Sequence, residues 1–293
     1  MPRILLLALA LLCGQGVSAA VDMDTAARIY EAAAVRDQVR ASLPAMPERI
    51  RDMFVAESKD KLSDEQLKAI KDAAERGFRI DVFEPAALAA MAARLDEPAA
   101  RKILKFLDSA LGVRMVAADK ALSSLDEPTI DKVMSGQIKP DSSAIRDKLF
   151  EKLEVAARST ESTVQIFASM GRAVATGTAI GTGADLAAAE ERSRLITEQT
   201  RKDMESNMRV PLRRYMSYGY RDLSNSDLRE LLSFLESRAG VNYVDAYSAA
   251  MSAGFETMGR RCGEQLGGAL RDLAQAHARS VLPADADSQA PTP

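Results

Sequence analysis

A thirteen-residue pattern occurs twice in this chain, at residues 104–116 and 232–244, with a constant offset of 128 residues. The copies read LKFLDSALGVRMV and LSFLESRAGVNYV. Both contain the spacing F-x-x-S-x-x-G, which is formed by Phe106, Ser109 and Gly112 in the first copy and by Phe234, Ser237 and Gly240 in the second. Self-similarity at a fixed offset indicates one supersecondary unit used twice. We therefore expect two related units.

The repeated pattern has the layout of a helix, a tight turn and a second helix. Phe and Leu are expected to face the core, and each signature serine stands where one helix can end and the next be capped. Other helix starts follow the same logic. Ser63 with Gln66 fits a capping box, Ser224 has a related layout, and Asp96 and Asp126 each precede a Glu-Pro pair suited to a first helical turn.

Helical patterns extend over almost the whole sequence. No segment alternates strictly between apolar and polar residues over the length of a strand. Leu228, Leu231, Leu232 and Leu235 form an amphipathic stripe, and a first helix is expected to turn polar along Ile29, Ala33, Arg36 and Arg40. The sequence predicts an all-α helical bundle of two related helical repeat units, at 22–140 and 141–282, divided near 136–141. The tail at 283–293 is low in apolar residues and expected to be disordered.

Residues 1–20 have the pattern of a secretory signal peptide, with Arg3, an apolar run and a small-residue end at Ala19 and Ala20. The run is shorter than the about 20 apolar residues that span a bilayer. We expect cleavage after Ala19 or Ala20 and a periplasmic or secreted protein with no transmembrane segment in the mature chain. Lipidation at Cys13 is disfavoured, because Leu12 stands where lipoprotein motifs carry a small residue.

Removal of Arg3 with the leader lowers the basic residues from 39 to 38 against 42 acidic ones, a net charge of −4. That balance gives no general attraction to nucleic acid or anionic lipid, so no nucleic-acid partner is expected. Cys262 becomes the one cysteine of the mature chain. We expect it to be buried and inert, with an intermolecular bridge as the alternative.

The signature of the repeat resembles a family of secreted proteobacterial helical proteins classed as a domain of unknown function. The second half carries the resemblance through residues 220–224, Leu228, 234–237 and Gly240, and the opening adds Ile29-Tyr30 and Leu43-Pro44. This resemblance implies an all-α fold and a periplasmic location. It implies no activity, because none is known for the family.

No catalytic motif is recognisable in the sequence. The one histidine, His277, is too few for a histidine-based metal site. Cys262 and His277 are fifteen residues apart, roughly 22 Å along a continuous helix, and would meet only if the chain reversed near 263–268. Ser109 and Ser237 lack a nucleophile elbow, and acidic pairs such as Glu190-Glu191 are typical of solvated helix faces. We expect no catalytic residue, no cofactor and no metal.

Residues 171–183 have the oddest local composition. A phosphate-binding loop is excluded, because no Gly-Lys-Ser/Thr follows. As a helix the segment carries two small-residue stripes, Ala173/Gly177/Gly181 and Gly171/Ala175/Ala179/Gly183. Each interior glycine costs about 1 kcal/mol relative to alanine, so we expect a closely packed or kinked core helix. A self-association face or a hinge is the alternative.

Arginines and tyrosines interleave in one further segment, and such mixtures bind anionic ligands. This candidate binding patch consists of Arg209, Arg213, Arg214, Tyr215, Tyr218 and Arg221. A helix with half-buried tyrosines and solvated arginines is the alternative.

Three functions stay open. The sequence favours a non-catalytic module that binds another envelope protein or itself, which an exposed apolar patch of several hundred Å² supports. The second is a small-molecule or lipid binder, since thirteen methionines and many alanines could line a cavity. An enclosed apolar pocket of about 300 Å³ or more supports it. The third is a cell-envelope hydrolase that uses carboxylates or a serine, which needs a cleft with converging titratable groups.

Overall fold

A computed structural model of the chain describes residues 21–57, 61–140 and 143–281. Within those ranges the chain forms thirteen α-helices and one 3-10 helix, with no strand. The predicted all-α class is therefore confirmed. The predicted leader at 1–20 and the predicted tail at 283–293 lie outside the described residues.

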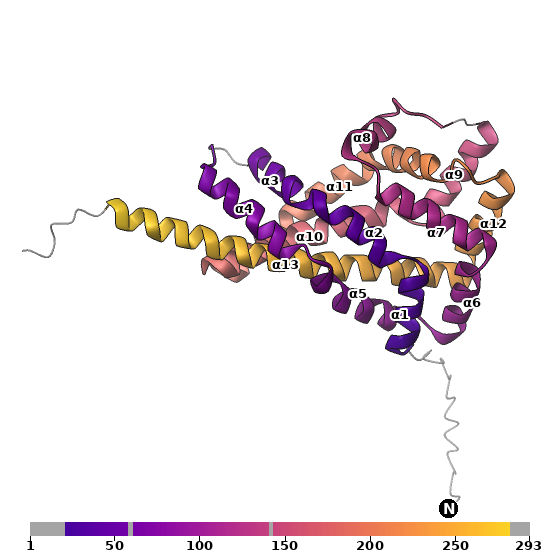
Figure 1. The fold of residues 1–293 in the computed structure, drawn as a ribbon, viewed down its shortest axis with the longest axis horizontal. Coiled ribbons are helices and arrows are strands. Elements are labelled where there is room, and N and C mark those ends of the chain that lie inside the picture. Colours follow the sequence, from indigo (N-terminus) through magenta and orange to yellow (C-terminus); the bar gives the residue numbers. More distant parts are fainter. Residues whose placement is uncertain (1–20, 58–60, 141–142, 282–293) are drawn as a thin grey trace, which may run out of the picture.

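The helices follow one another through short connections (Figure 1). Their bounds are α1 (Met23–Ala32), α2 (Val35–Ser42), the 3-10 helix η1 (Leu43–Ala45), α3 (Met46–Glu57), α4 (Asp64–Gly77), α5 (Ile80–Arg94), α6 (Glu97–Leu107), α7 (Ala110–Ser123), α8 (Glu127–Ser135), α9 (Ala144–Ala156), α10 (Ser159–Thr182), α11 (Leu186–Gly219), α12 (Asn225–Glu236) and α13 (Arg238–Val281).

The long helix α13 runs through most of the length of the molecule (Figure 1). It packs against α10 and also against α4, α5 and α6 from the first predicted unit. Buried residues of both units, such as Ile103 and Leu231, belong to one hydrophobic cluster. The two predicted units therefore share a core.

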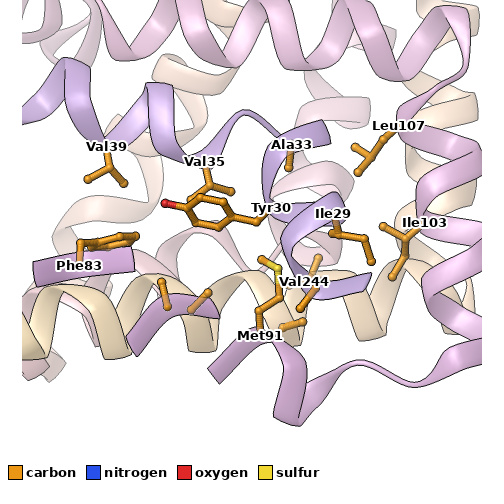
Figure 2. Close-up of a cluster of buried hydrophobic side chains, with 14 of the residues drawn as sticks. Ile29, Tyr30, Ala33, Val35, Val39, Phe83, Met91, Ile103, Leu107 and Val244 are labelled. Atoms are coloured by element: carbon orange, nitrogen blue, oxygen red, sulfur yellow. The ribbon is translucent and has the colours of Figure 1, made fainter. Parts of the chain in front are cut away.

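Part of that shared core surrounds Tyr30 of α1 (Figure 2). The tyrosine lies among Val35 of α2, Phe83 and Met91 of α5, and all four side chains are buried. Val244 of α13 approaches the same cluster. Apolar side chains from the start and the end of the chain thus stabilise one another by leaving water together.

The helix expected over Ile29 to Arg40 is interrupted, which corrects the sequence-based prediction. Ala34, between α1 and α2, adopts a left-handed backbone with φ 51°. The interruption allows Ile29 before it and Val35 and Val39 after it to be buried in the same core. In an unbroken helix the buried side chains of Tyr30 and Val39 would point to opposite sides, because a separation of nine residues is about two and a half turns. Tertiary packing outweighs local propensity here.

The two signature turns have the same structure. Ser109 Oγ accepts a hydrogen bond from Gly112 N at 3.0 Å, and Ser237 Oγ accepts one from Gly240 N at 3.1 Å. Each serine is thus the predicted cap at a helix junction. A Cβ atom on Gly112 would lie 2.1 Å from the Phe106 carbonyl oxygen, and one on Gly240 would lie 2.0 Å from that of Phe234. Glycine is required at both positions because the backbone of the preceding helix lies so close.

The two turns also contact each other directly. The rings of Phe106 and Phe234 stack with centroids 3.7 Å apart and an interplanar angle of 4°. The helices around the turns keep the sequence offset, since α6 and α12 begin at Glu97 and Asn225. The repeat in the sequence is therefore a repeat in space, with its two copies side by side.

The other predicted helix starts are confirmed. Ser63 and Gln66 form a capping box, and Ser224 forms one with Asp227. Asp96 and Asp126 cap α6 and α8, with proline in the first turn of each helix. The stripe of leucines on α12 is buried as expected; its members are Leu228, Leu231, Leu232 and Leu235.

The glycine-rich segment forms the tight contact between α10 and α13. A Cβ on Gly177 would lie 2.3 Å from the Arg260 carbonyl oxygen, and one on Gly263 would lie 2.1 Å from that of Val174. The stripe Ala173/Gly177/Gly181 therefore faces α13, as a closely packed core helix requires. In the second stripe nothing lies within 4 Å of a Cβ built on Gly171.

Candidate functional site

A cavity of about 380 Å³ lies where α7 and α13 leave the stacked turns, and it is partly open to solvent. We call it the Asp119 cavity. Helices α2, α9, α10, α11 and α12 complete its wall. Its lining combines aliphatic side chains, methionines, hydroxyl groups, one carboxylate and four tyrosines, namely Tyr215, Tyr220, Tyr243 and Tyr247.

The cavity is built on equivalent positions of the repeat. Met115 on α7 and Tyr243 on α13 are separated by the repeat offset, and so are Asp119 and Tyr247. All four side chains line the cavity. The two copies agree at the turn but differ in chemistry one and two helical turns later, at the positions that face this space.

The carboxyl group of Asp119 is the main ionisable feature of the cavity. Burial raises the pKa of Asp119 to about 7, although the hydrogen bond from Tyr220 acts in the opposite direction. Tyr220 Oη donates that bond to Asp119 Oδ1 at 2.8 Å. A carboxyl group with this pKa changes charge close to neutral pH.

The tyrosines are held in place by hydrogen bonds to the protein. Tyr215 Oη donates to the Leu122 carbonyl oxygen at 2.8 Å, and Tyr247 Oη donates to Gln38 Oε1 at 3.0 Å. The rings of Tyr243 and Tyr247 lie 6.0 Å apart. Burial raises the pKa of all four cavity tyrosines, and the negative charge of Asp119 adds to each increase.

Hydroxyl groups form the α10 side of the cavity. Ser162 and Ser248 share a hydrogen bond of 2.7 Å between their Oγ atoms, joining α10 to α13. Ser159 and Thr163 lie on the same wall. The cavity therefore combines hydroxyl groups with aromatic and aliphatic surface, which is the composition of a small-molecule site.

The predicted arginine–tyrosine patch lies along the second half of α11 and in the turn that follows it, and most of its arginines are used in internal contacts. Arg209 bridges Glu154 at 3.1 Å and Glu161 at 2.7 Å. Arg213 pairs with Glu151 at 3.0 Å. Because carboxylates neutralise these two side chains, neither presents an unbalanced positive charge to an anionic ligand.

The remaining patch residues separate into different environments. Arg214 donates to the Met134 carbonyl oxygen at 3.0 Å. Tyr215 lines the Asp119 cavity. Arg221 lies over the ring of Tyr218 at 4.4 Å, and this pair borders a separate surface groove of about 330 Å³ beside Arg114. The six residues thus do not form a single surface.

Sequence reasoning missed Asp119, Tyr243 and Tyr247. A signal was available in the repeat itself, since Asp119 follows Met115 by one helical turn on a face that is otherwise apolar. A carboxylate on such a face is unusual unless it is paired or has a function. The comparison of the two copies beyond residue 116 would have revealed it.

Cys262 and His277 do not meet. Both lie on the continuous helix α13, which does not reverse near residues 263–268. Cys262 is free and buried, as predicted, and burial raises the pKa of its thiol to about 12. Such a thiol is a poor nucleophile at neutral pH.

Within residues 21–57, 61–140 and 143–281, no group of three or more His, Cys, Asp or Glu side chains is arranged to hold a metal ion. In the same part of the chain, no helix is long and apolar enough to cross a membrane.

The chain was compared with protein-family models, curated proteins and solved structures, and nothing in any of the three matches it. The resemblance to a secreted proteobacterial family stays a prediction that these comparisons do not support.

Proposed function

We propose that this protein binds a small amphipathic molecule in the Asp119 cavity. One observation carries the proposal: a partly open space of about 380 Å³ with apolar walls, four tyrosines and a single, partly buried carboxylate. Sites for small ligands combine apolar surface with a few positioned polar groups in a volume of this order. Because the sequence predicts a leader peptide at residues 1–20, we propose that binding takes place in the periplasm.

We propose that the protein binds this molecule without changing it chemically. Acid–base catalysis needs a group that exchanges a proton with the substrate at a suitable pKa. Asp119 has such a pKa, but its hydrogen-bond partner is Tyr220, whose pKa is raised well above its usual value. A fixed carboxylate beside tyrosines is suited to holding a ligand.

A protein-interaction module, which the sequence alone favours, ranks second. Its support would be a contiguous apolar surface. The large exposed hydrophobic side chains of the described residues are distributed over helices from α1 to α13, with examples at Met23, Val113, Phe167 and Val241.

Native mass spectrometry of gently purified protein tests the binding proposal. We expect the wild-type chain to retain a small mass. Thr163→Trp places an indole in the cavity and should abolish retention, because Thr163 lines the wall. Arg172→Trp is the matched control on the exposed side of the same helix α10 and should retain the mass. Equal retention by both variants would place the ligand elsewhere.

A further inference from the structure

The Asp119 cavity has an unbalanced charge. Among the described residues that line it, Asp119 is the only charged side chain. Its Oδ1 atom accepts the hydrogen bond from Tyr220, and Oδ2 accepts none from the described residues. A buried carboxylate is stable in its charged form only when a cation or several donors face it. Asp119 is partly buried, and the described residues supply one side-chain donor to its carboxylate, which leaves the other oxygen open to a cation from the ligand.

The hydroxyl groups of the surrounding tyrosines are mostly engaged elsewhere. Tyr215 and Tyr247 donate to Leu122 and Gln38, and Tyr220 already donates to Asp119. Gln38 in turn donates its amide to the Ala33 carbonyl oxygen at 2.8 Å. The described lining also contains no lysine, arginine or histidine, so an anionic ligand would meet no positive charge there to balance its own.

The tyrosine rings supply a second kind of attraction for a positive charge. Tyr215 comes from α11, Tyr220 directly follows the end of that helix, and Tyr243 and Tyr247 come from α13. All four are close enough to Asp119 for its charge to raise their pKa values. Aromatic rings around a site attract ammonium groups through their negative faces, and such cages recognise quaternary ammonium ligands.

We propose that the ligand of the Asp119 cavity is an organic cation, with an ammonium group held beside the Asp119 carboxylate and the four tyrosine rings. This inference rests on the proposed function and specifies the chemical class of its ligand. The cavity volume of about 380 Å³ accommodates an ammonium head with a short apolar tail against Met115 and Met251.

The test compares two probes of nearly the same shape. Choline carries a permanent positive charge, and 3,3-dimethylbutan-1-ol replaces its nitrogen with carbon. Calorimetric titration at pH 8, where Asp119 is ionised, should give a dissociation constant for choline at least about tenfold lower than for the alcohol. Because the two probes have nearly the same shape and the alcohol is the more apolar of the two, a preference for choline reports attraction to its positive charge.

Variants of cavity residues test whether the preference for choline over the alcohol arises in the Asp119 cavity. Asp119→Asn should reduce the choline preference to about twofold or less, because the amide keeps the shape and removes the charge. Tyr243→Leu should weaken choline binding about three- to tenfold and affect the alcohol less. Asp108→Asn is the control: it removes a carboxylate from an exposed position outside the cavity and should bind choline like the wild type.

The outcomes separate the two proposals. Equal binding of both probes, unchanged by Asp119→Asn, would overturn the cation assignment and leave a neutral ligand in the cavity. Binding of neither probe, with a retained native mass that Thr163→Trp removes, would also overturn it. Loss of the proposed function itself has a different signature, which is a retained mass or probe affinity that Thr163→Trp does not change.

Discussion

The two signature turns and the helices that leave them differ in an informative way. At the turns the copies agree closely: Ser109 and Ser237 each donate a hydrogen bond of 2.6 Å to the preceding phenylalanine carbonyl oxygen. One and two helical turns later the copies diverge, with Met115 and Asp119 on α7 opposite Tyr243 and Tyr247 on α13. The shared turns thus place the two helices, and the residues that differ between the copies line the cavity.

The helices that follow the turns differ in length as well. α7 ends at Ser123, shortly before the Asp126 cap and the proline of α8, whereas α13 continues to Val281. The extension of α13 carries Gly259, Gly263 and Gly267, which face α10 closely. The helix of the second copy thus makes a close contact with α10 at Met170 and Val174, just beyond the α10 residues that line the cavity.

The largest expected loss of stability comes from changing the glycines that the two signature turns share. Gly112→Ala and Gly240→Ala should each lower the free energy of unfolding by at least about 3 kcal/mol, because a Cβ would overlap a backbone carbonyl oxygen. Chemical denaturation measures both variants. A loss below about 1 kcal/mol in either copy would mean that the turn relaxes easily. Gly171→Ala, with nothing within 4 Å, should raise stability by up to about 1 kcal/mol.

The next effect concerns the part of α13 that has no counterpart in α7. Gly263→Ala should cost about 2 to 3 kcal/mol, since its Cβ would lie 2.1 Å from the Val174 carbonyl oxygen and force α10 away from α13. Because α10 forms one wall of the cavity, probe binding should weaken in parallel. Denaturation and calorimetry on the same sample check both. Undiminished binding in a destabilised protein would show that the wall does not depend on this contact.

The sequence predicted the shared features of this comparison but not its differences. Caps at Ser109 and Ser237 depend on residues three apart, and the glycine stripe of α10 depends on a spacing of four, so both are visible locally. The break at Ala34 and the meeting of Asp119 with Tyr220 depend on contacts between distant segments. The arginine–tyrosine patch is continuous in the sequence but not in space. Its neighbouring residues point to different surroundings, with Arg209 on Glu154 and Tyr215 in the cavity.

The pH dependence of the Asp119→Asn variant's stability tests the difference between Asp119 in the first copy and Tyr247 at the equivalent position of the second. In the unfolded chain the carboxyl group has its usual pKa of 3.8, and in the fold the pKa is about 7. Between these values the folded state keeps a proton that the unfolded state releases, so this group makes stability fall as pH rises. The full shift corresponds to about 4 kcal/mol. Because Asp119 is partly exposed and water screens its charge, the variant should be more stable than the wild type by roughly 1 to 2 kcal/mol at pH 8 and similar at pH 4.

Denaturation curves at several pH values measure that difference. Other carboxyl groups, such as Asp227 with a pKa lowered by Arg114 and its capping contacts, contribute equally to both proteins and cancel. The cavity tyrosines remain neutral through this range, because the pKa of each is raised above its usual value of 10. A constant difference across pH would mean that Asp119 titrates normally and that water fills its surroundings.

The smallest expected loss of stability comes from removing the capping serines, and it tests whether the two turns are energetically equivalent. Ser109→Ala and Ser237→Ala should each cost about 1 kcal/mol, the usual value of an N-terminal cap. The costs should be equal within about 0.3 to 0.5 kcal/mol, because the hydrogen bonds to Gly112 N and Gly240 N differ by only 0.1 Å, at 3.0 and 3.1 Å. The stacked rings of Phe106 and Phe234 join the two turns, so the double variant should depart from the sum. A strictly additive result would mean that the copies act as independent caps that merely touch.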